Sequence, residues 1–363
     1  MQTYPVATIN LAALKHNLSR VKLLAPNSRI MSVIKANAYG HGAIEVAHAL
    51  TDSDAFAVAR LPEGLQLRTA GISQPIVILE GVHSVVDLHT AAEHALSLVF
   101  HNEPQIDLLD GAQLTQPLRF CWLMLETGMH RLGLPIEKLN DVLQQLSASP
   151  NMSESIGLMS HFANADEVDD ACNTQQLNQL KQVTNQSGLA TSMANSAAIL
   201  SNPESHGDWL RPGLMLYGIS PFGDRSAEDL GLKPVMQLQS VITAIQTVKA
   251  GKHVGYGGDW TAKADSQIAI VSIGYGDGYS RQLSNTGNVL VHDQTARVVG
   301  RVSMDMIAVD ISHLSSVSIG DKVTLWGDGL AVESVAQQAK TIPYELVCQV
   351  SDRVLREYQH GEA

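Results

Sequence analysis

The sequence contains few cysteines and no long apolar run, and each shortage excludes a class of protein. The three cysteines, Cys121, Cys172 and Cys348, are far apart in a chain of 363 residues. A disulfide framework or a cysteine metal site is therefore not expected, and a reducing cytoplasm fits best. No uninterrupted apolar stretch approaches the roughly 20 residues that span a bilayer. The opening string, M-Q-T-Y-P-V-A-T-I-N, has neither the basic nor the apolar region of a secretory signal.

Basic residues are scarce as well. Lysine and arginine together number 24, against 36 aspartates and glutamates, which gives a net charge of −12. Nucleic acid and anionic membrane surfaces are therefore not expected as partners, and a phosphate ligand would need a local pocket. The 14 histidines form no metal-spaced pair such as H-E-x-x-H, so no metal site is predicted.

A large apolar fraction is present, and it is strongly patterned. Hydrophobic residues make up 45% of the sequence and charged residues 17%, which is enough for a core spread over two domains. Between residues 9 and 218, short apolar runs alternate with stretches of helical periodicity. The predicted strands span residues 30–34, 55–59, 76–79, 96–100, 118–125, 156–160 and 191–194. The predicted helices span residues 11–24, 44–50, 62–69, 85–91, 104–109, 136–146 and 172–186.

This alternation predicts an α/β fold with a parallel sheet, and its length suits a (β/α)8 TIM barrel. A doubly wound sheet is the alternative, although no G-x-G-x-x-G follows the first strand. After about residue 231, β-rich segments separated by Gly and Asp turns predict a mainly β-strand domain, barrel-like in outline. We therefore expect a barrel at residues 1–230 and a C-terminal all-β domain at 231–363, and leave open whether the first residues join the β domain.

The string V-I-K-A-N-A-Y-G-H-G, residues 33–42, carries the strongest chemical signal. Lys35 directly follows an apolar, β-branched run that predicts a buried strand, and it precedes a Gly-rich turn. A lysine there is well placed for an amine whose pKa must fall so that it can act as nucleophile or base near neutral pH. The alternative is a strand-end lysine whose head group reaches water.

Polar residues recur after other predicted strands, in the strings E-T-G-M-H-R-L-G, S-H-F-A-N-A-D, A-N-S-A-A and W-L-R-P-G-L-M-L-Y-G. The carboxyl ends of barrel strands form the face where active sites are built, so these residues are expected to converge. They are Lys35, Tyr39, Arg131, His161, Asn195, Ser196 and Arg211. Each alone has a simpler interpretation, such as a core histidine, a helix-capping serine or an arginine that pairs with a carboxylate.

Together these strings resemble the alanine racemase family, whose members use pyridoxal 5′-phosphate (PLP), in the same order and with comparable spacing. The resemblance implies that Lys35 holds PLP covalently. It also implies that Tyr39 sends its hydroxyl to the phosphate of the cofactor. Ser196 would bind the same phosphate with the backbone amides of Gly213 and Leu214, because backbone N–H groups make a natural anion site.

The resemblance also implies roles for the remaining barrel residues. Arg131 would bond the phenolic oxygen of the cofactor and help to steer the substrate carboxylate. Arg211 would face the pyridine nitrogen, with His161 behind it, and Asn195 would line the cofactor site. Arginine keeps its proton, since its pKa exceeds about 12. A pyridine nitrogen that faces it should therefore stay unprotonated, which favours return of the proton over transamination.

Three strings of the β-rich half match the same family: V-G-Y-G-G-D-W, I-G-Y-G-D-G-Y and G-R-V-S-M-D-M. By themselves they could be Gly-rich hairpins and an ordinary strand. The resemblance implies that Tyr256 is a second catalytic base, which the partner subunit of a homodimer delivers to the active site. Tyr275 and Met304 would lie near the substrate carboxylate, with Asp305 beside Met304.

Two bases on opposite faces of a planar centre can invert it without moving the substrate. By resemblance, Lys35 serves the D face and Tyr256 the L face. A tyrosine with a reference pKa near 10 is a poor base at neutral pH. It would need a positive neighbour, and a His161–Arg211 chain is the candidate.

Two positions depart from the family pattern. Many members carry a lysine, carbamylated in some, two residues before the acidic residue that matches Glu126, and Met124 stands there in this sequence. The carbamate is therefore not expected. Asp352 stands near the C-terminus, where some members place a phosphate-binding tyrosine.

The resemblance implies a cytoplasmic, homodimeric, PLP-dependent enzyme that interconverts L- and D-alanine, either for peptidoglycan or in alanine catabolism. One alternative is a racemase of a larger amino acid on the same scaffold. A decarboxylase of the same fold group would have an acidic partner at the pyridine nitrogen, so Arg211 argues against it. A non-enzymatic PLP carrier would be a lone barrel, so the β domain and Tyr256 argue against that alternative.

Overall fold

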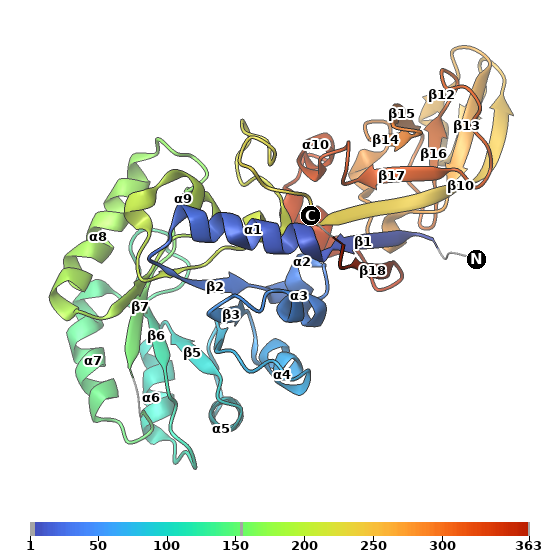
Figure 1. Cartoon of the computed structure of the whole chain (residues 1–363). Coiled ribbons are helices and arrows are strands. Elements are labelled where there is room, and N and C mark those ends of the chain that lie inside the picture. Colours follow the sequence, from blue (N-terminus) through green and yellow to red (C-terminus); the bar gives the residue numbers. More distant parts are fainter. Residues whose placement is uncertain (1–3, 153–154, 362–363) are drawn as a thin grey trace.

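The computed structural model describes residues 4–152 and 155–361 and shows a barrel and a β-rich body, with the long strand β10 running between them (Figure 1). Eight parallel strands close the barrel in chain order, β2 to β9, which confirms the predicted fold class. These strands are β2 (Arg29–Val33), β3 (Ala55–Val58), β4 (Ile76–Ile78), β5 (Ser97–Phe100), β6 (Cys121–Met124), β7 (Ile156–Met159), β8 (Ala190–Ser192) and β9 (Trp209–Leu210).

Helices between the strands cover the outside of the barrel (Figure 1). β3, β4 and β7 are buried along their whole length, as expected of parallel strands covered on both faces. The barrel helices are α1 (Leu11–Leu24), α3 (Ala43–Ala49), α4 (Leu61–Thr69), α5 (Val85–Glu93), α6 (Glu103–Gly111), α7 (Leu139–Ala148), α8 (Ala171–Ser187) and α9 (Ser196–Ser201). Short 3-10 turns add η1 (Ile136–Lys138), η2 (Pro203–Ser205) and η3 (Leu214–Tyr217).

The second body is a mostly antiparallel sheet with the strand order β13-β16-β15-β14-β17-β10-β1-β18, and the pairing of β13 with β10 closes part of it into a ring. Its strands are β1 (Val6–Asn10), β10 (Met236–Val248), β13 (Ser266–Val271), β14 (Asn288–Val291), β15 (Gln294–Val299), β16 (Ile307–Asp310), β17 (Lys322–Trp326) and β18 (Leu355–Gln359). A separate hairpin joins β11 (His253–Val254) to β12 (Trp260–Thr261), and further turns are η4 (Tyr256–Gly258), η5 (Tyr275–Asp277) and η6 (Arg281–Leu283).

Two features of these bodies differ from the sequence-based expectation, and the sequence left a third open. β9 is absent from the predicted strands, although it closes the barrel by pairing with β2 and β8. Two helices, α10 (Val332–Gln338) and α11 (Pro343–Gln349), accompany the second sheet, in a half of the chain that the sequence predicts to be mainly β-strand. β1 lies in that sheet, antiparallel to β10 and parallel to β18. The division of the chain at residue 230 stays a prediction.

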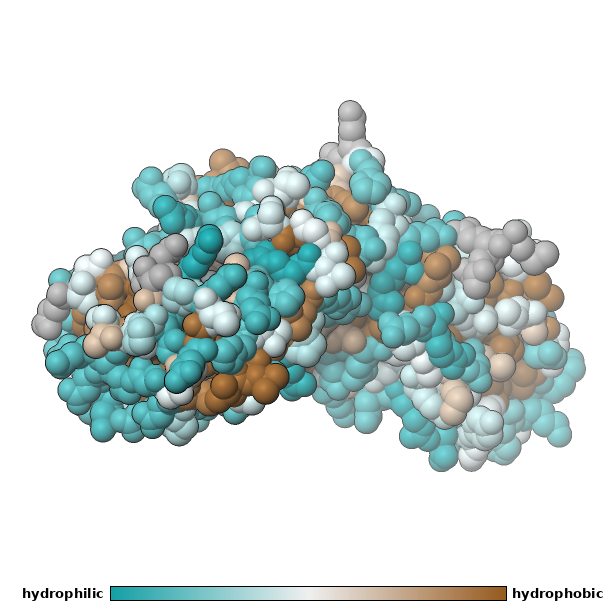
Figure 2. All heavy atoms as spheres, turned by 90° about the horizontal axis from the view of Figure 1, so that it is seen from below, coloured by the Kyte–Doolittle hydropathy of each residue, from teal (hydrophilic) through white to brown (hydrophobic). Residues whose placement is uncertain are grey.

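The surface in Figure 2 is mostly hydrophilic, with hydrophobic side chains exposed in separate patches. Over residues 4–152 and 155–361, no helix combines the length and the apolar character needed to cross a membrane. One buried apolar cluster extends from the barrel into the second sheet. The two bodies therefore share a core rather than meeting only through a linker.

Candidate active site

Lys35 follows the end of β2 and opens the short segment α2 (Lys35–Tyr39), which is a left-handed turn rather than a normal helix. The four residues after Lys35 all have φ between 52° and 53°, a conformation that costs free energy in residues with a side chain. Gly40 continues the turn with φ 79°, and a Cβ atom at this position would collide with the carbonyl oxygen of Val347 in α11. The glycine that follows Tyr39 is therefore required both by the turn and by close packing.

The amine of Lys35 lies in surroundings that disfavour its charged form. Burial lowers the pKa of Lys35, and the charge of Arg131 lowers it further. The carboxylates of Glu63 and Glu80 act in the opposite direction. Because burial is the largest of these effects, the amine is closer to its neutral, nucleophilic form than a solvated lysine would be.

Tyr39 and Ser196 meet at the backbone of Gly213. A Cβ atom at Gly213 would lie only 2.6 Å from the Tyr39 hydroxyl oxygen, so only glycine permits this approach. The Ser196 hydroxyl accepts hydrogen bonds from the amides of Gly213 (2.9 Å) and Met215 (3.2 Å). The Ser196 side chain thus does not cap α9, since the Asn195 side chain takes that role through the amide of Ala198.

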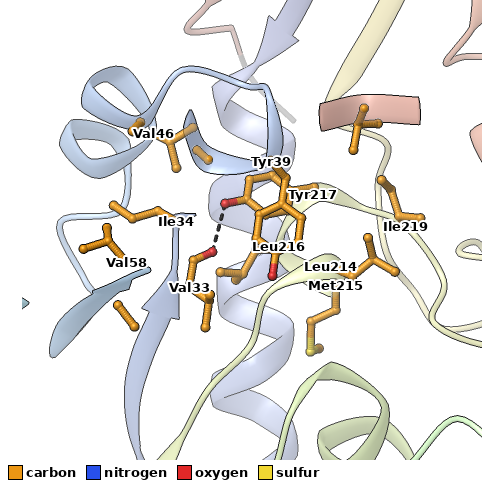
Figure 3. Close-up of a cluster of buried hydrophobic side chains, with 14 of the residues drawn as sticks. Val33, Ile34, Tyr39, Val46, Val58, Leu214, Met215, Leu216, Tyr217 and Ile219 are labelled. Atoms are coloured by element: carbon orange, nitrogen blue, oxygen red, sulfur yellow. Dashed lines mark hydrogen bonds between the residues drawn. The ribbon is translucent and has the colours of Figure 1, made fainter. Parts of the chain in front are cut away.

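The back of this cluster is an aromatic and aliphatic core (Figure 3). The ring of Tyr39 lies 4.9 Å from the ring of Tyr217, whose hydroxyl donates to the carbonyl of Val33 (3.0 Å) at the end of β2. Leu214, which the resemblance assigns to phosphate binding through its amide, is buried in the same cluster. The end of β2, just before Lys35, and the segment that contains Gly213 are therefore fixed to each other.

Arg211 is buried just after β9 and is held by several acceptors. Its guanidinium donates to the Ser192 hydroxyl (2.6 Å) and to the Ser160 carbonyl, and lies 3.3 Å from Nδ1 of His161. Burial first, and then the charges of Arg211, Arg131 and Lys35, lower the pKa of His161 to about 3. Since arginine only donates, the neutral His161 accepts through Nδ1 and carries its proton on Nε2.

Arg131 stands on the exposed loop after β6, and its charge acts on both Lys35 and His161. Met124 lines a cavity of about 30 Å³ together with Arg131 and His161. An uncharged thioether therefore lies beside Arg131, at the position where the resemblance led us to look for a lysine. The barrel residues singled out in the sequence thus gather around Lys35, Gly213 and Arg211.

The residues predicted from the β-rich half are exposed, and Tyr256 lies apart from this cluster within one chain. Tyr256 lies between β11 and β12, and Figure 1 places β12 at the end of the second body that is remote from the barrel strands. The side chains of Tyr256, Tyr275 and Met304 are 71%, 44% and 51% exposed. Asp305 pairs with Arg353 (2.7 Å).

Two residues near the cluster were not anticipated from the sequence. The ring of Tyr344 in α11 lies 5.9 Å from the ring of Tyr39, whereas the side chain of Asp352 is fully exposed. A tyrosine does therefore stand beside Tyr39, but it lies eight positions before Asp352 in the sequence. Glu63 bonds the amide of Ala36 (2.7 Å), directly after Lys35. The string I-P-Y-E, which contains Tyr344, was the available signal for the first of these residues.

Fold and site together define a class: a (β/α)8-barrel protein with a second β domain and a lysine-centred site at the carboxyl ends of the barrel strands. Residues 9–221 match the family described as "Alanine racemase, N-terminal domain", and residues 235–358 match "Alanine racemase, C-terminal domain". The chain belongs to the alanine racemase family.

Individual relatives agree with this assignment over nearly the whole chain. The alanine racemase of Shewanella woodyi is 47% identical over 354 residues, which cover 98% of this chain and 99% of the relative. A protein of Escherichia coli named "Alanine racemase, biosynthetic" is 44% identical over 351 residues, with 96% and 98% covered.

Solved structures are equally similar in fold. The biosynthetic alanine racemase of Pseudomonas aeruginosa superposes with a TM-score of 0.95 at 43% identity, and the match covers 99% of this chain and 100% of that structure. An alanine racemase of Bartonella henselae with covalently bound pyridoxal phosphate gives a TM-score of 0.89 at 28% identity, with the same coverage.

Proposed function

We propose that the protein is a PLP-dependent alanine racemase that interconverts L- and D-alanine with two bases, Lys35 and Tyr256, and supplies D-alanine for the cell wall. Relatives that match both halves of the chain carry the name alanine racemase, and one is described as biosynthetic. The observation that carries the proposal is the lysine with a lowered pKa just after β2, together with the Tyr39 and Ser196 hydroxyls that meet at the backbone of Gly213. When bound, PLP delocalises the electron pair that remains when the α-proton of the amino acid leaves.

The side chains of the barrel fit this cofactor. The Lys35 amine, whose pKa is lowered mainly by burial, would attach to the cofactor aldehyde. The Tyr39 hydroxyl lies against the Gly213 backbone beside Ser196, and these groups would hold the phosphate. The Arg211 guanidinium, fixed by Ser192 and Ser160, would meet the ring nitrogen as a donor that keeps its proton. We further propose Asn195 and Leu214 as lining residues of this site.

Proton movement would be divided between the two bodies of the molecule. Lys35 would remove or return the α-proton on one face, and the hydroxyl of Tyr256 from a partner subunit would do so on the other. Arg131 would help to bind the substrate carboxylate on the barrel side, and Tyr275 and Met304 would lie near that carboxylate on the partner side, with Asp305 beside Met304. This proposal requires a homodimer, because Tyr256 is exposed and lies in the turn before β12, which Figure 1 places at the end of the second body remote from the barrel strands.

The alternatives with a different chemistry have less support. A PLP carrier that consists of a barrel alone would lack the C-terminal domain that residues 235–358 match in this chain. A decarboxylase would place a carboxylate where Arg211 stands, and Arg211 bonds hydroxyl, carbonyl and imidazole groups in this chain.

Two measurements test the proposal. Protein purified with PLP should absorb at the edge of the visible range, and after reduction with borohydride, peptide mapping should find the cofactor on Lys35. A chiral screen of amino acids should then show racemisation of alanine above that of larger side chains. A label on another lysine would overturn the assignment of Lys35, and preference for a larger amino acid would overturn the substrate.

A further inference from the structure

The turn that follows Lys35 is the most strained part of the site. Ala36, Asn37, Ala38 and Tyr39 all adopt positive φ, and none is a glycine. A side chain makes this conformation unfavourable at each residue, so a run of four persists only when the surroundings hold it. The contacts that hold the turn therefore also set the direction in which Lys35 leaves β2.

Glu63 makes the contact nearest to Lys35. One carboxylate oxygen, Oε1, accepts from the amide of Ala36 (2.7 Å), the first peptide of the turn. The other, Oε2, accepts from the amides of Ala59 (2.7 Å) and Arg60 (2.9 Å) at the end of β3. A single carboxylate thus ties the turn after β2 to the neighbouring strand end, and bonds from amides to a charged acceptor are the strong kind.

We propose that Glu63 is a positioning residue for Lys35, and that its carboxylate, by fixing the Ala36 peptide, holds the Lys35 amine where the cofactor aldehyde is bound. The inference rests on the proposed role of Lys35. A helix-capping role alone would require only Oε2, which serves Arg60 at the start of α4. The bond from Oε1 to a different segment of chain is what points beyond capping.

The opposite end of the turn is clamped independently. Nε of Arg356 in β18 donates to the carbonyl of Gly40 (2.8 Å), and a Cβ atom at Gly42 would collide with the Tyr358 hydroxyl. With that end fixed by the second body, loss of the Glu63 contact should loosen the Lys35 end in particular. A local loss of this kind is expected to act on cofactor attachment more than on global stability.

The chain offers a matched control for the charge of Glu63. Glu80 also raises the pKa of Lys35 through its charge, but its carboxylate pairs with the Arg60 side chain (3.2 Å). Glu80→Gln removes a carboxylate from the same region and leaves the amides of the turn as they are. Glu63→Gln removes the charge and also places an amide N–H₂ against at least one of the three backbone donors: Ala36 in one orientation of the amide, Ala59 and Arg60 in the other.

The experiment compares PLP affinity, by equilibrium dialysis of protein freed of cofactor, with kcat, KM for alanine and the visible spectrum. In Glu63→Gln we expect PLP affinity and kcat to fall by about 10–100-fold, as for a misplaced reacting group, with a smaller change in KM. Glu80→Gln should stay within about threefold, since it removes only a partly screened charge. Glu63→Asp, which keeps the charge but is one methylene shorter, should fall in between.

A rescue sharpens the test. Glycine adopts positive φ without a Cβ penalty, so Ala36→Gly should restore several-fold of the affinity lost in Glu63→Gln while changing the wild type little. Unchanged PLP affinity and kcat in Glu63→Gln, or equal losses in Glu63→Gln and Glu80→Gln, would overturn the positioning role. Wild-type protein that fails to attach PLP to Lys35 would instead overturn the proposed function.

Discussion

The two residues proposed as bases, Lys35 and Tyr256, stand in opposite surroundings. Lys35 is enclosed by its own chain, and both burial and the charge of Arg131 lower its pKa. Tyr256 occupies a short turn of the second body, where its side chain is 71% exposed. Most of the groups around Lys35 therefore come from its own chain, whereas Tyr256 is left exposed to solvent within one chain. Tyr256 is therefore expected to act only against the barrel of another subunit.

The largest loss of activity is expected when Lys35 is replaced. Lys35→Ala should abolish covalent attachment of PLP and lower racemisation by at least about 10⁴-fold, since it removes both the attachment point and one base. Lys181→Ala is the matched control, because Lys181 forms an exposed ion pair with Glu204. Steady-state rates and borohydride labelling would measure both variants. Retained labelling in Lys35→Ala would contradict the account.

A second test examines whether the exposed Tyr256 of one subunit completes the active site of another. Lys35→Ala and Tyr256→Ala proteins, each nearly inactive, should regain activity when unfolded together and refolded as mixed dimers. Random pairing with one intact site per mixed dimer predicts about a quarter of the wild-type rate. Mixed dimers, verified by two different affinity tags, that recover no activity would show that the two bases do not come from different chains.

A smaller effect is expected on the pH dependence of the free energy of unfolding. It should arise from histidines in and near the site and not from an exposed histidine of the second body. The pKa of His161 is lowered to about 3 and that of His41 to about 4, in both cases mainly by burial. Below the unfolded value near 6.5, the unfolded chain binds protons that the folded chain does not. Stability is thus complete above pH 6.5 and falls as pH drops towards 4, by up to about 1.4 kcal/mol per pH unit for each histidine.

Urea unfolding at pH 7.5 and 5.5 would measure this loss. His161→Gln should reduce the difference between the two pH values, whereas His253→Gln in the exposed hairpin of the second body should leave it unchanged. An equal pH response in wild type and His161→Gln would mean that His161 is protonated in the folded protein, against its buried position beside Arg211.

Most of the fold could be predicted because its signals are local. α1 occupies residues 11–24 and β4 residues 76–78, where the apolar pattern predicted a helix and a strand. β9 was missed because its two residues are too short for any period to appear. The place of β1 was left open because its partners, β10 and β18, are more than 200 residues away in the sequence.

The site was predictable to a similar degree and for similar reasons. Lys35, Tyr39, Ser196 and Arg211 belong to strings that follow strands, and their convergence follows from barrel geometry. Glu63 could not be singled out from the sequence, because a glutamate in the first turn of a helix is typical of an ordinary capping residue. Its bond to Ala36 depends on a left-handed turn that the string A-N-A-Y gives no reason to expect.

Lys35 and Tyr256 are proposed to act on opposite faces of the substrate, and proton exchange from each enantiomer measures the two bases separately. In Tyr256→Phe, racemisation should fall by about 10²–10⁴-fold, the usual effect of losing a general base. Each enantiomer of alanine would be incubated separately with this variant in deuterated solvent, and NMR would follow loss of the α-proton. The account predicts that D-alanine still exchanges through Lys35 while exchange from L-alanine collapses. Equal loss from both enantiomers, or unchanged racemisation, would contradict it.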